Sequence, residues 1–371
     1  MKKRIYKQLL LIVCFLSCFS VVATTSTLAN LGQIINKEVR EQHAFYGLAS
    51  YYNGINYYLL ENEKLSKIDE NTEIQLNSSQ WFLAVGRFKV LIVQAEQLSF
   101  KISENNFYLL EEPKKTLSQS SIKISNKSEL KERNPLFDQV RYAHLWSPLA
   151  WLAKGVETSL NFLHQYISNW GWVIVIFSVL LKIVMIPAGI MTVKFQRKVS
   201  QVKTALEPQL LEIKQNYDGE KAHNKIMAAH KQLGVSPFYT LKPILASFIQ
   251  VPILIAVFNA LGEMSVLIGQ PFLWISDLAY PDSIASLPMA FPLFGRELSL
   301  LPVIMTLVTV FSTRIFNNKF ASEKELKSQK VKLYLMAAAF FVLFYPFPAA
   351  MVLYWVLANI LQTIQQQLIK I

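Results

Sequence analysis

The sequence predicts a mainly α-helical, polytopic membrane protein with a small exported β-rich domain and a cytoplasmic helical hairpin. The hydrophobic content of 52% and the mean hydropathy of +0.29 are too high for an ordinary soluble protein. Several apolar runs approach the roughly 20 residues that span a bilayer. The net charge of +12 would suit nucleic-acid binding, but the basic residues collect at the N-terminus and in two loops between apolar runs. Cytoplasmic loops of membrane proteins have this distribution, so we expect no specific nucleic-acid binding.

Residues 1–29 form the first predicted segment. Four basic residues precede the apolar run Leu9–Ala23, which is followed by "TTSTLAN". This pattern predicts either a cleaved signal peptide or a retained first span, and in both cases the next segment is exported. The only two cysteines, Cys14 and Cys18, lie in this run, so no disulfide framework is expected.

Residues 30–143 are expected to form a small exported (periplasmic) β-rich domain followed by a linker. The stretches "QWFLAVGRFKVLIV" (80–93) and "EQLSFKISENNFYLL" (96–110) are rich in β-branched and aromatic residues. The composition becomes polar from Glu111 onward, as in a linker. Nothing in this region suggests a catalytic set.

Residues 144–371 are expected to form the membrane core. An amphipathic helix is predicted over 148–168, lying along the exported membrane surface, because its apolar residues recur every three or four positions. The last two spans flank "YPFPAA", whose prolines prevent a continuous helix. Five spans are predicted, at 170–191, 243–266, 298–316, 332–345 and 348–364.

Loop charge orients these spans. Residues 194–242 hold nine basic and four acidic residues, and residues 314–332 hold six and two. Residues 267–297 hold one basic and three acidic residues. The two basic loops are therefore assigned to the cytoplasm, together with both chain termini. The first loop, 192–242, has two apolar stripes joined at Asp218-Gly219, which predicts a helical hairpin. Such a hairpin either packs only on itself or meets an incoming polypeptide, a ribosome or anionic lipid.

Lys182 is the main candidate for a functional residue. It lies within "SVLLKIVMIPAG", in the middle of a predicted span. A lysine at the centre of a span costs about 2.5–3.5 kcal/mol on insertion scales, so such residues usually serve a function. The sequence has no HExxH, P-loop or GxSxG pattern. We therefore expect no enzyme activity, no catalytic residues, no metal site and no cofactor.

The core sequence resembles a known family. In order, it contains "NWGWVIVIFSVLLKIVMIP", "LEPQLLEIKQNYDGEKAHNKIMAAHKQLGVSPF", "FIQVPILIAVFNAL", "PFLWISDLAYPD", "LPVIMTLVTVF" and "YPFPAAMVLYWVLANILQTIQQQLI". This set, over about residues 140–371, resembles the YidC family of membrane protein insertases. "QWFLAVGRFKVLIV" also looks like part of the exported domain of Gram-negative members, which favours a retained first span.

The resemblance implies a function. It implies a chaperone of the bacterial inner membrane that inserts and helps fold nascent membrane proteins, alone or with the Sec translocon, without a cofactor. The ribosome is a further implied partner. Lys370 is the only basic residue after the last predicted span. We therefore expect ribosome contact to rest on the two cytoplasmic loops.

The resemblance also implies a substrate groove. Lys182 takes the position where family members carry a positive residue, commonly arginine, in a hydrophilic groove open to the cytosol and to lipid but closed on the exported side. Family motifs place four further residues in that groove: Ser178, Gln250, Tyr354 and Trp355.

Helical spacing alone adds Thr306, Thr309 and Thr313, which share one face of their span. Each groove candidate also has a simpler interpretation. A hydroxyl in a span often bonds its own helix, Gln250 can satisfy backbone groups freed by Pro252, and the two aromatic residues can be ordinary packing residues.

Two other functions fit an intramembrane lysine. A secondary transporter or channel would use it to bind an anion or relay protons, but the sequence has no internal repeat and no pair of Gly/Pro-broken helices. An intramembrane enzyme would use Lys182 as the base for Ser178, and only their spacing supports this.

Overall fold

The computed structural model describes residues 31–69, 71–94, 98–103, 106–109, 122–236, 238, 239, 248, 250–291, 294–315 and 323–368. The predicted first span, 1–29, and residues 111–121 of the predicted linker lie outside these residues. The rest of the predicted linker is not irregular, because it contains strand β8 (Ile122–Asn126) and the short helix α3 (Leu130–Arg133). The chain forms two compact units, one of residues 1–43 and 52–140 and the other of residues 44–51 and 141–371.

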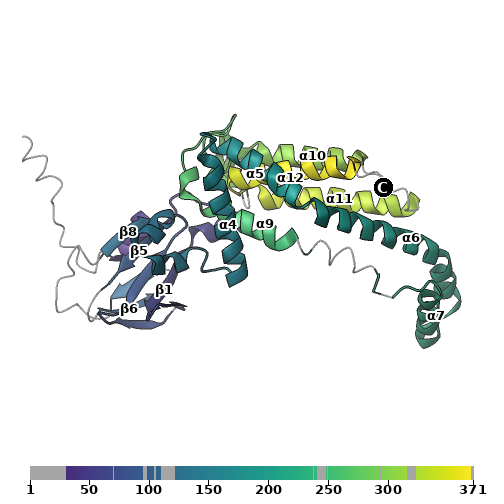
Figure 1. Ribbon diagram of the computed structural model, residues 1–371, viewed down its shortest axis with the longest axis horizontal. Coiled ribbons are helices and arrows are strands. Elements are labelled where there is room, and N and C mark those ends of the chain that lie inside the picture. The colour runs from purple at the N-terminus through teal and green to yellow at the C-terminus, as the bar shows by residue number, and fades with distance from the viewer. Residues whose placement is uncertain are drawn as a thin grey trace, which may run out of the picture. The chain divides into compact units, whose positions relative to one another are not determined.

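The first unit is built on two antiparallel sheets (Figure 1). The larger has the strand order β2-β1-β4-β5-β8 and the smaller the order β3-β6-β7. The predicted stretch 80–93 forms the hairpin β4–β5, and the stretch 96–110 forms β6–β7. The strands are β1 (Asn56–Glu61), β2 (Lys64–Lys67), β3 (Glu73–Leu76), β4 (Trp81–Val85), β5 (Lys89–Val93), β6 (Leu98–Ser103), β7 (Asn106–Leu109) and β8 (Ile122–Asn126).

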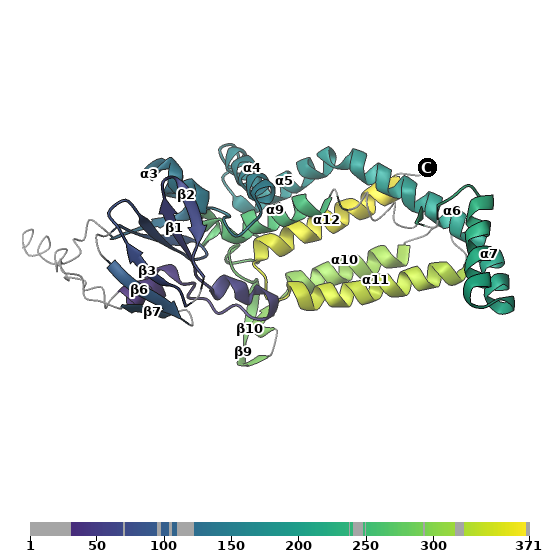
Figure 2. The ribbon, with the colours of Figure 1, turned by 90° about the horizontal axis from the view of Figure 1, so that it is seen from below.

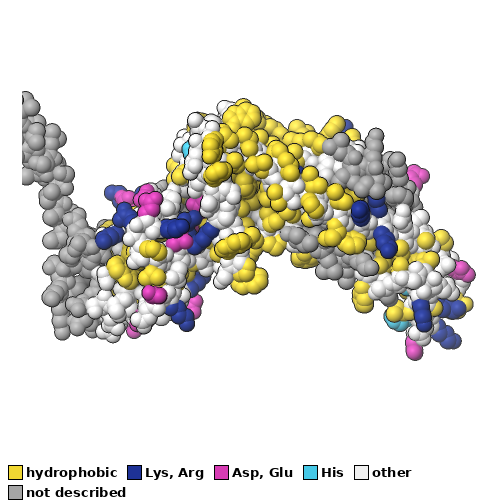
Figure 3. Space-filling model, in the orientation of Figure 1, with side chains coloured by type: hydrophobic (Ala, Val, Ile, Leu, Met, Phe, Trp, Pro, Cys, Tyr) yellow, Lys and Arg dark blue, Asp and Glu magenta, His cyan; other side chains and the backbone are white. Residues whose placement is uncertain are grey.

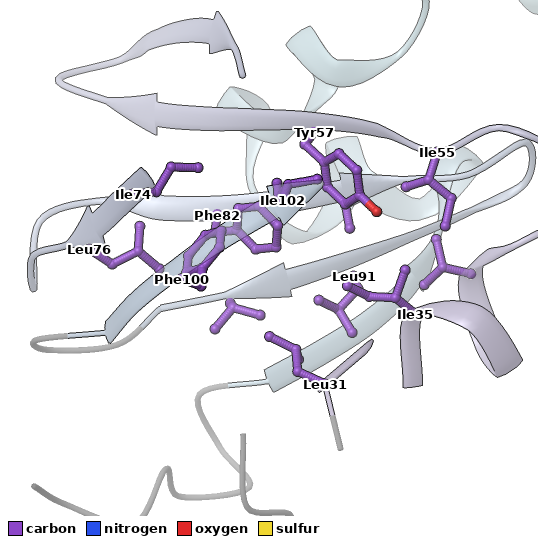
Figure 4. Close-up of a cluster of buried hydrophobic side chains, with 13 residues drawn as sticks. Leu31, Ile35, Ile55, Tyr57, Ile74, Leu76, Phe82, Leu91, Phe100 and Ile102 are labelled. Atoms are coloured by element: carbon purple, nitrogen blue, oxygen red, sulfur yellow. The ribbon is translucent and has the colours of Figure 1, made fainter. Parts of the chain in front are cut away.

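The core of this unit is aromatic and β-branched (Figure 4). Phe82 of β4 lies between Tyr57 and Phe100, with ring centroids 5.9 and 4.7 Å away. Four of the five residues in β4 and in β5 are buried. A strand buried on both faces has a continuous apolar run rather than an alternating one, which explains the composition of 80–93.

The described part of this unit starts with helix, within the region that the sequence predicted to be β-rich. Helix α2 (Leu31–Ile34) continues as a wider helical turn, Ile35–Val39. The buried residues of this segment are spaced four apart, at Leu31, Ile35 and Val39. This is the spacing of a helix. The turn lies so close to Gly86 that a Cβ there would come within 2.1 Å of the Val39 carbonyl oxygen, so Gly86 permits this packing.

The second unit is a helical bundle with a long hairpin (Figures 1 and 2). Helix α12 is its central element and packs against α5, α9 and α10, while α10 packs on α11 and α4 packs on α9. Its helices are α4 (Ser147–His164), α5 (Trp170–Val184), α6 (Ile186–Asn216), α7 (Gly219–Gln232), α9 (Gln250–Glu263), α10 (Leu301–Ile315), α11 (Glu323–Phe344) and α12 (Ala349–Leu368).

The predicted span 170–191 is not one straight helix. Helix α5 ends at Val184, and α6 continues after a bend of 57°. Pro187 in the first turn of α6 explains the break, because proline lacks an N–H and clashes with the preceding turn. Among the described residues no single helix meets the length and hydropathy of a membrane span, whereas α5 and α6 meet them together.

The predicted cytoplasmic hairpin is formed by α6 and α7. Its seam buries Leu206, Ala229 and Tyr239. Pro208 lies inside α6 without interrupting it. Helix α11 begins at Glu323, nine residues before the predicted span, because the charged residues ahead of the apolar run continue the same helix.

The loop 267–297 contains structure that the sequence did not predict. Strands β9 (Ser283–Phe291) and β10 (Gly295–Ser299) form an antiparallel hairpin, which is labelled in Figure 2. The rest of the loop packs against helix ends, as described below.

The exterior of the helical bundle is strongly apolar, and hydrophobic side chains cover its middle in Figure 3. Leu307 and Phe311 of α10 are 62% and 63% exposed, and Leu335 of α11 is 67% exposed. Apolar patches of this extent mark surfaces that meet lipid or protein. The bundle therefore presents an apolar exterior of the kind that meets lipid or protein.

Candidate functional site

Lys182 lies in the last turn of α5 and is half-buried. Its Nζ donates a hydrogen bond to Oε1 of Gln362 in α12, 180 residues along the chain. No ion pair joins Lys182 to any residue in the described part of the chain. The ammonium therefore faces a neutral amide, and the partial negative charge at the C-terminal end of α5 also favours it there.

A second polar contact lies beside this pair. The hydroxyl oxygens of Thr363 in α12 and Ser312 in α10 are 2.6 Å apart. Gln362 and Thr363 are consecutive, so one turn of α12 contacts both α5 and α10 through polar side chains.

Gln365 of α12 lies one helical turn after Gln362 and is 9% exposed. Neither its amide nitrogen nor its amide oxygen has a hydrogen-bond partner within the described residues. Gly189 of α6 faces it, and a Cβ at Gly189 would lie 2.5 Å from Gln365 Nε2. The glycine thus makes room for the amide. We use the name polar turn for this group of polar side chains, which consists of Lys182, Gln362, Ser312, Thr363 and Gln365.

The hydroxyl residues predicted from the sequence bond to their own helices. Ser178 is buried and donates to the Ile174 carbonyl at 2.7 Å. Thr306 and Thr309 donate to the carbonyls of Pro302 and Met305, at 2.8 and 2.9 Å. Thr313 donates to the Thr309 carbonyl at 2.8 Å. Ser178 is one turn from Lys182, whereas contact from α10 to α12 comes from Ser312, which helical spacing did not select.

The two aromatic candidates pack among other rings. Trp355 lies 5.6, 5.2 and 5.0 Å, between ring centroids, from Phe258, Phe340 and Phe344. Tyr354 is buried, with its ring centroid 6.2 Å from Phe258. Eight residues of helix, or about 12 Å, separate Tyr354 from Gln362. The structure therefore places these aromatics two turns from the polar turn.

Gln250 is the first residue of α9 and is half-buried. Among the described residues, no hydrogen bond joins it to Lys182. In the same part of the chain, no three His, Cys, Asp or Glu side chains lie close enough to hold a metal ion.

Comparison with known proteins identifies the family. The family model described as "60Kd inner membrane protein" matches residues 162–371, which is more than half of the chain. The "Membrane protein insertase YidC" of Chlorobaculum parvum is 32% identical over 213 residues, covering 57% of this chain and 34% of the relative. This chain belongs to the YidC family. The corresponding protein of Janthinobacterium sp. is 30% identical over 217 residues, covering 58% of this chain and 36% of the relative.

The match is confined to part of these relatives. The chain covers about a third of their length. A solved structure titled "Active YidC insertase crystal structure with the first transmembrane domain resolved" covers 85% of this chain and 71% of its own, at 18% identity and a TM-score of 0.41. The family name and the relatives indicate the bacterial inner membrane.

In this YidC-family chain, the motif "PFLWISDLAYPD" holds three helix ends together. At α5, the Asn169 side chain accepts from the Gly171 and Trp172 amides at 3.0 and 3.3 Å and donates to the Pro271 carbonyl at 3.2 Å. Gly171 is essential to this packing, because a Cβ there would lie 2.0 Å from the Phe272 ring.

The same motif contacts α12 and α10. The carbonyls of Leu278 and Tyr280 accept from the first amides of α12, at Ala350 and Ala349, over 2.9 and 2.8 Å. Asp282 accepts from the amides of Leu300 and Leu301 at the start of α10. These hydrogen bonds satisfy amides that a helix N-terminus otherwise leaves unpaired. They also fix the three helix ends at one end of the bundle, opposite the polar turn.

Proposed function

We propose that this chain is an insertase that moves segments of nascent membrane proteins into the bacterial inner membrane through a cytosol-open groove at Lys182. The observation that carries the proposal is the Lys182–Gln362 contact within a bundle whose exterior is apolar. A charged side chain inside such a bundle is costly unless water or a partner reaches it. A groove that water enters from the cytosol supplies that access.

The geometry supports a groove that is closed on the exported side. Lys182 is twelve residues into α5, about 18 Å from the end of the helix that the exported loop holds. From Lys182 the chain continues into α6 and the basic hairpin, which the positive-inside rule assigns to the cytoplasm. The polar part of a client therefore has only part of the bilayer left to cross.

The driving force comes from the client. Its polar tail enters the groove, where Lys182 attracts acidic residues, while its apolar segment moves into lipid beside the exposed Ile183 and Val184. Burial of apolar surface provides about 25 cal/mol per Å². The scheme uses no nucleotide and no covalent step.

The proposed groove also includes Ser178, Gln250, Thr306, Thr309, Tyr354 and Trp355 as lining residues. The proposed partners are the lipid bilayer, the Sec translocon and the ribosome, and ribosome contact is proposed to rest on the two cytoplasmic loops. Both chain termini are proposed to be cytoplasmic, with the β-rich unit in the periplasm.

Reconstitution tests the proposal. We expect purified protein in liposomes to insert a single-span client whose exported tail carries two aspartates, as measured by protease protection. Lys182→Arg keeps the charge and should insert this client at least as well as the wild type. Lys182→Met should fail on it and affect a client with an uncharged tail less. Lys67→Met, at an exposed site in the first unit, is the control.

Two outcomes contradict the proposal. One is normal insertion of the acidic-tailed client by Lys182→Met, which would remove the charge from the mechanism. The other is wild-type protein that inserts neither client but takes up a solute, which would favour the transporter or channel alternative.

A further inference from the structure

We infer that the neutral side chain of Gln362 permits the selectivity of the groove for acidic client tails, acting as the resting partner that a client carboxylate displaces from Lys182. This inference rests on the proposed insertase function. It follows from the contact between Lys182 Nζ and Gln362 Oε1, which joins the only charged group of the polar turn to an uncharged acceptor.

A neutral partner leaves the ammonium available for exchange. The bond from the Lys182 ammonium to the Gln362 amide has one charged partner. A client carboxylate that replaces the amide oxygen adds a second, opposite charge, so the exchange gains the Coulomb attraction between the two charges. A tail without an acidic residue has no such gain, so the exchange discriminates between the two clients.

The surroundings of Gln362 support this exchange. The next residue, Thr363, is engaged with Ser312 of α10, which holds this turn of α12 in place while the Gln362 side chain moves. One turn on, the buried amide of Gln365 has no partner among the described residues. The turn thus has one spare amide group, that of Gln365, for a polar atom that accompanies the carboxylate.

A carboxylate at position 362 would prevent a client carboxylate from binding Lys182. In a Gln362→Glu variant the new carboxylate would form an ion pair with Lys182, and both positions are half-buried, so salt would screen this pair less than an exposed one. Because it is tethered to the same chain, it would also have a high effective concentration compared with a client. The substituted side chain would therefore occupy the site that a client needs.

The test measures the ratio of insertion rates for two matched clients, one with two aspartates in its exported tail and one with two serines. Gln362→Glu should lower the acidic-to-uncharged ratio about tenfold, because a client carboxylate must compete with a carboxylate tethered beside Lys182. Gln362→Met has a similar volume, removes the resting partner and adds no competitor, so it should not lower the ratio. Gln367→Glu, exposed on the same helix, places the same charge outside the contact and should leave the ratio unchanged.

A second, independent experiment exchanges the lysine and the glutamine between the two helices. Lys182→Gln combined with Gln362→Lys keeps one ammonium and one amide at the contact but exchanges their helices. We expect this double variant to recover the ratio that Lys182→Gln alone loses, which a purely structural role for Gln362 would not produce. Insertion of the uncharged client monitors folding in every variant.

Three results would overturn the inference. The first is a ratio within twofold of wild type for Gln362→Glu. The second is an equal loss for both clients, which would make Gln362 a structural residue while leaving the insertase function intact. The third is an unrecovered ratio in the transposed variant when its uncharged client inserts normally. Failure of the insertase function itself is seen separately, as wild-type protein that inserts neither client.

Discussion

The carboxylate of Asp282 accepts the backbone amide of Leu301 at 2.7 Å and so caps helix α10. The same oxygen accepts from the Leu300 amide at 2.9 Å and from Trp274 Nε1 at 3.3 Å. Asp282 is only 2% exposed. One side chain thus joins the motif "PFLWISDLAYPD" to the start of α10.

The first prediction concerns the contribution of the Asp282 cap to the stability of the protein. Asp282→Ala removes the acceptor and should lower the free energy of unfolding by about 1 kcal/mol, the typical loss of an N-cap. The measurement is thermal or denaturant unfolding in detergent. Ser283→Ala, at the next and less buried position, is the comparison, and an equal effect there would argue against the cap.

The pH dependence of the same site has a defined sign. Burial raises the pKa of Asp282 above its ordinary value of 3.8, against the lowering effect of the hydrogen bonds from Leu301 and Trp274. The folded state therefore holds this proton more tightly than the unfolded state, so its contribution is greatest below pH 3.8 and is lost as the pH rises through the folded pKa. We expect Asp282→Asn to gain stability relative to wild type across this interval. A constant difference between the two would refute the shift.

Glu157 should be the most sensitive residue where α4 packs against the segment that precedes it. Its Oε2 lies 2.5 Å from Arg141 Nη2 and accepts the Tyr142 hydroxyl at 2.8 Å, and both charged side chains are nearly buried. Burial and the Glu157 charge hold the pKa of Tyr142 well above its usual value of 10.0, so Tyr142 remains a donor. Removing one member of a buried pair costs about 3–5 kcal/mol, which we expect for Glu157→Gln in thermal unfolding.

A double variant distinguishes the pair from its packing. Arg141→Met with Glu157→Met removes both charges and should be far less destabilising than either charge removed alone. Additive losses in this double-mutant cycle would show that the two residues act independently.

Residues 44–51 should stabilise the second unit although they precede the β-rich region in sequence. Phe45 is 3% exposed and stacks on Tyr280 with a centroid distance of 6.2 Å. Truncation of a buried phenylalanine typically costs about 3–5 kcal/mol, so Phe45→Ala should markedly lower the unfolding temperature. Leu48→Ala, at a site 64% exposed, is the matched control. Equal effects of the two would show that this segment does not support the bundle.

The sequence predicted most of what depends on local pattern. Apolar runs and proline positions located the helices of the bundle, and the Asp218-Gly219 turn located the hairpin, because these signals act over a few residues. The partner of Lys182 was not predictable, since it lies 180 residues away on another helix. The segment "QTIQQQ" contains several glutamines, and the sequence does not indicate which of them faces the lysine. The contribution of residues 44–51 was hidden for the same reason, because pairing between distant segments is decided by packing.

Hydroxyl residues illustrate a second limit. Thr306 and Thr309 share a helical face, as the spacing required, yet each bonds a carbonyl of its own helix. Periodicity gives the face of a side chain but not its rotamer, and a hydroxyl can satisfy itself locally. Ser312 contacts α12 in addition to its own helix, and only the tertiary structure distinguishes it.

Gln365 provides a final test, in which stability and activity should change in opposite directions. A buried amide without a partner costs about 1–3 kcal/mol, so Gln365→Leu should raise the unfolding temperature of the protein in detergent. If the amide serves the polar part of a passing client, the same variant should insert clients more slowly. Gly189→Ala reaches the site from α6, because its new Cβ would lie 2.5 Å from Gln365 Nε2 and displace the amide. It should slow insertion without the gain in stability, whereas Gln367→Leu, at an exposed position, should change neither. A stabilised Gln365→Leu that inserts at the wild-type rate would show that the unpartnered amide has no part in insertion.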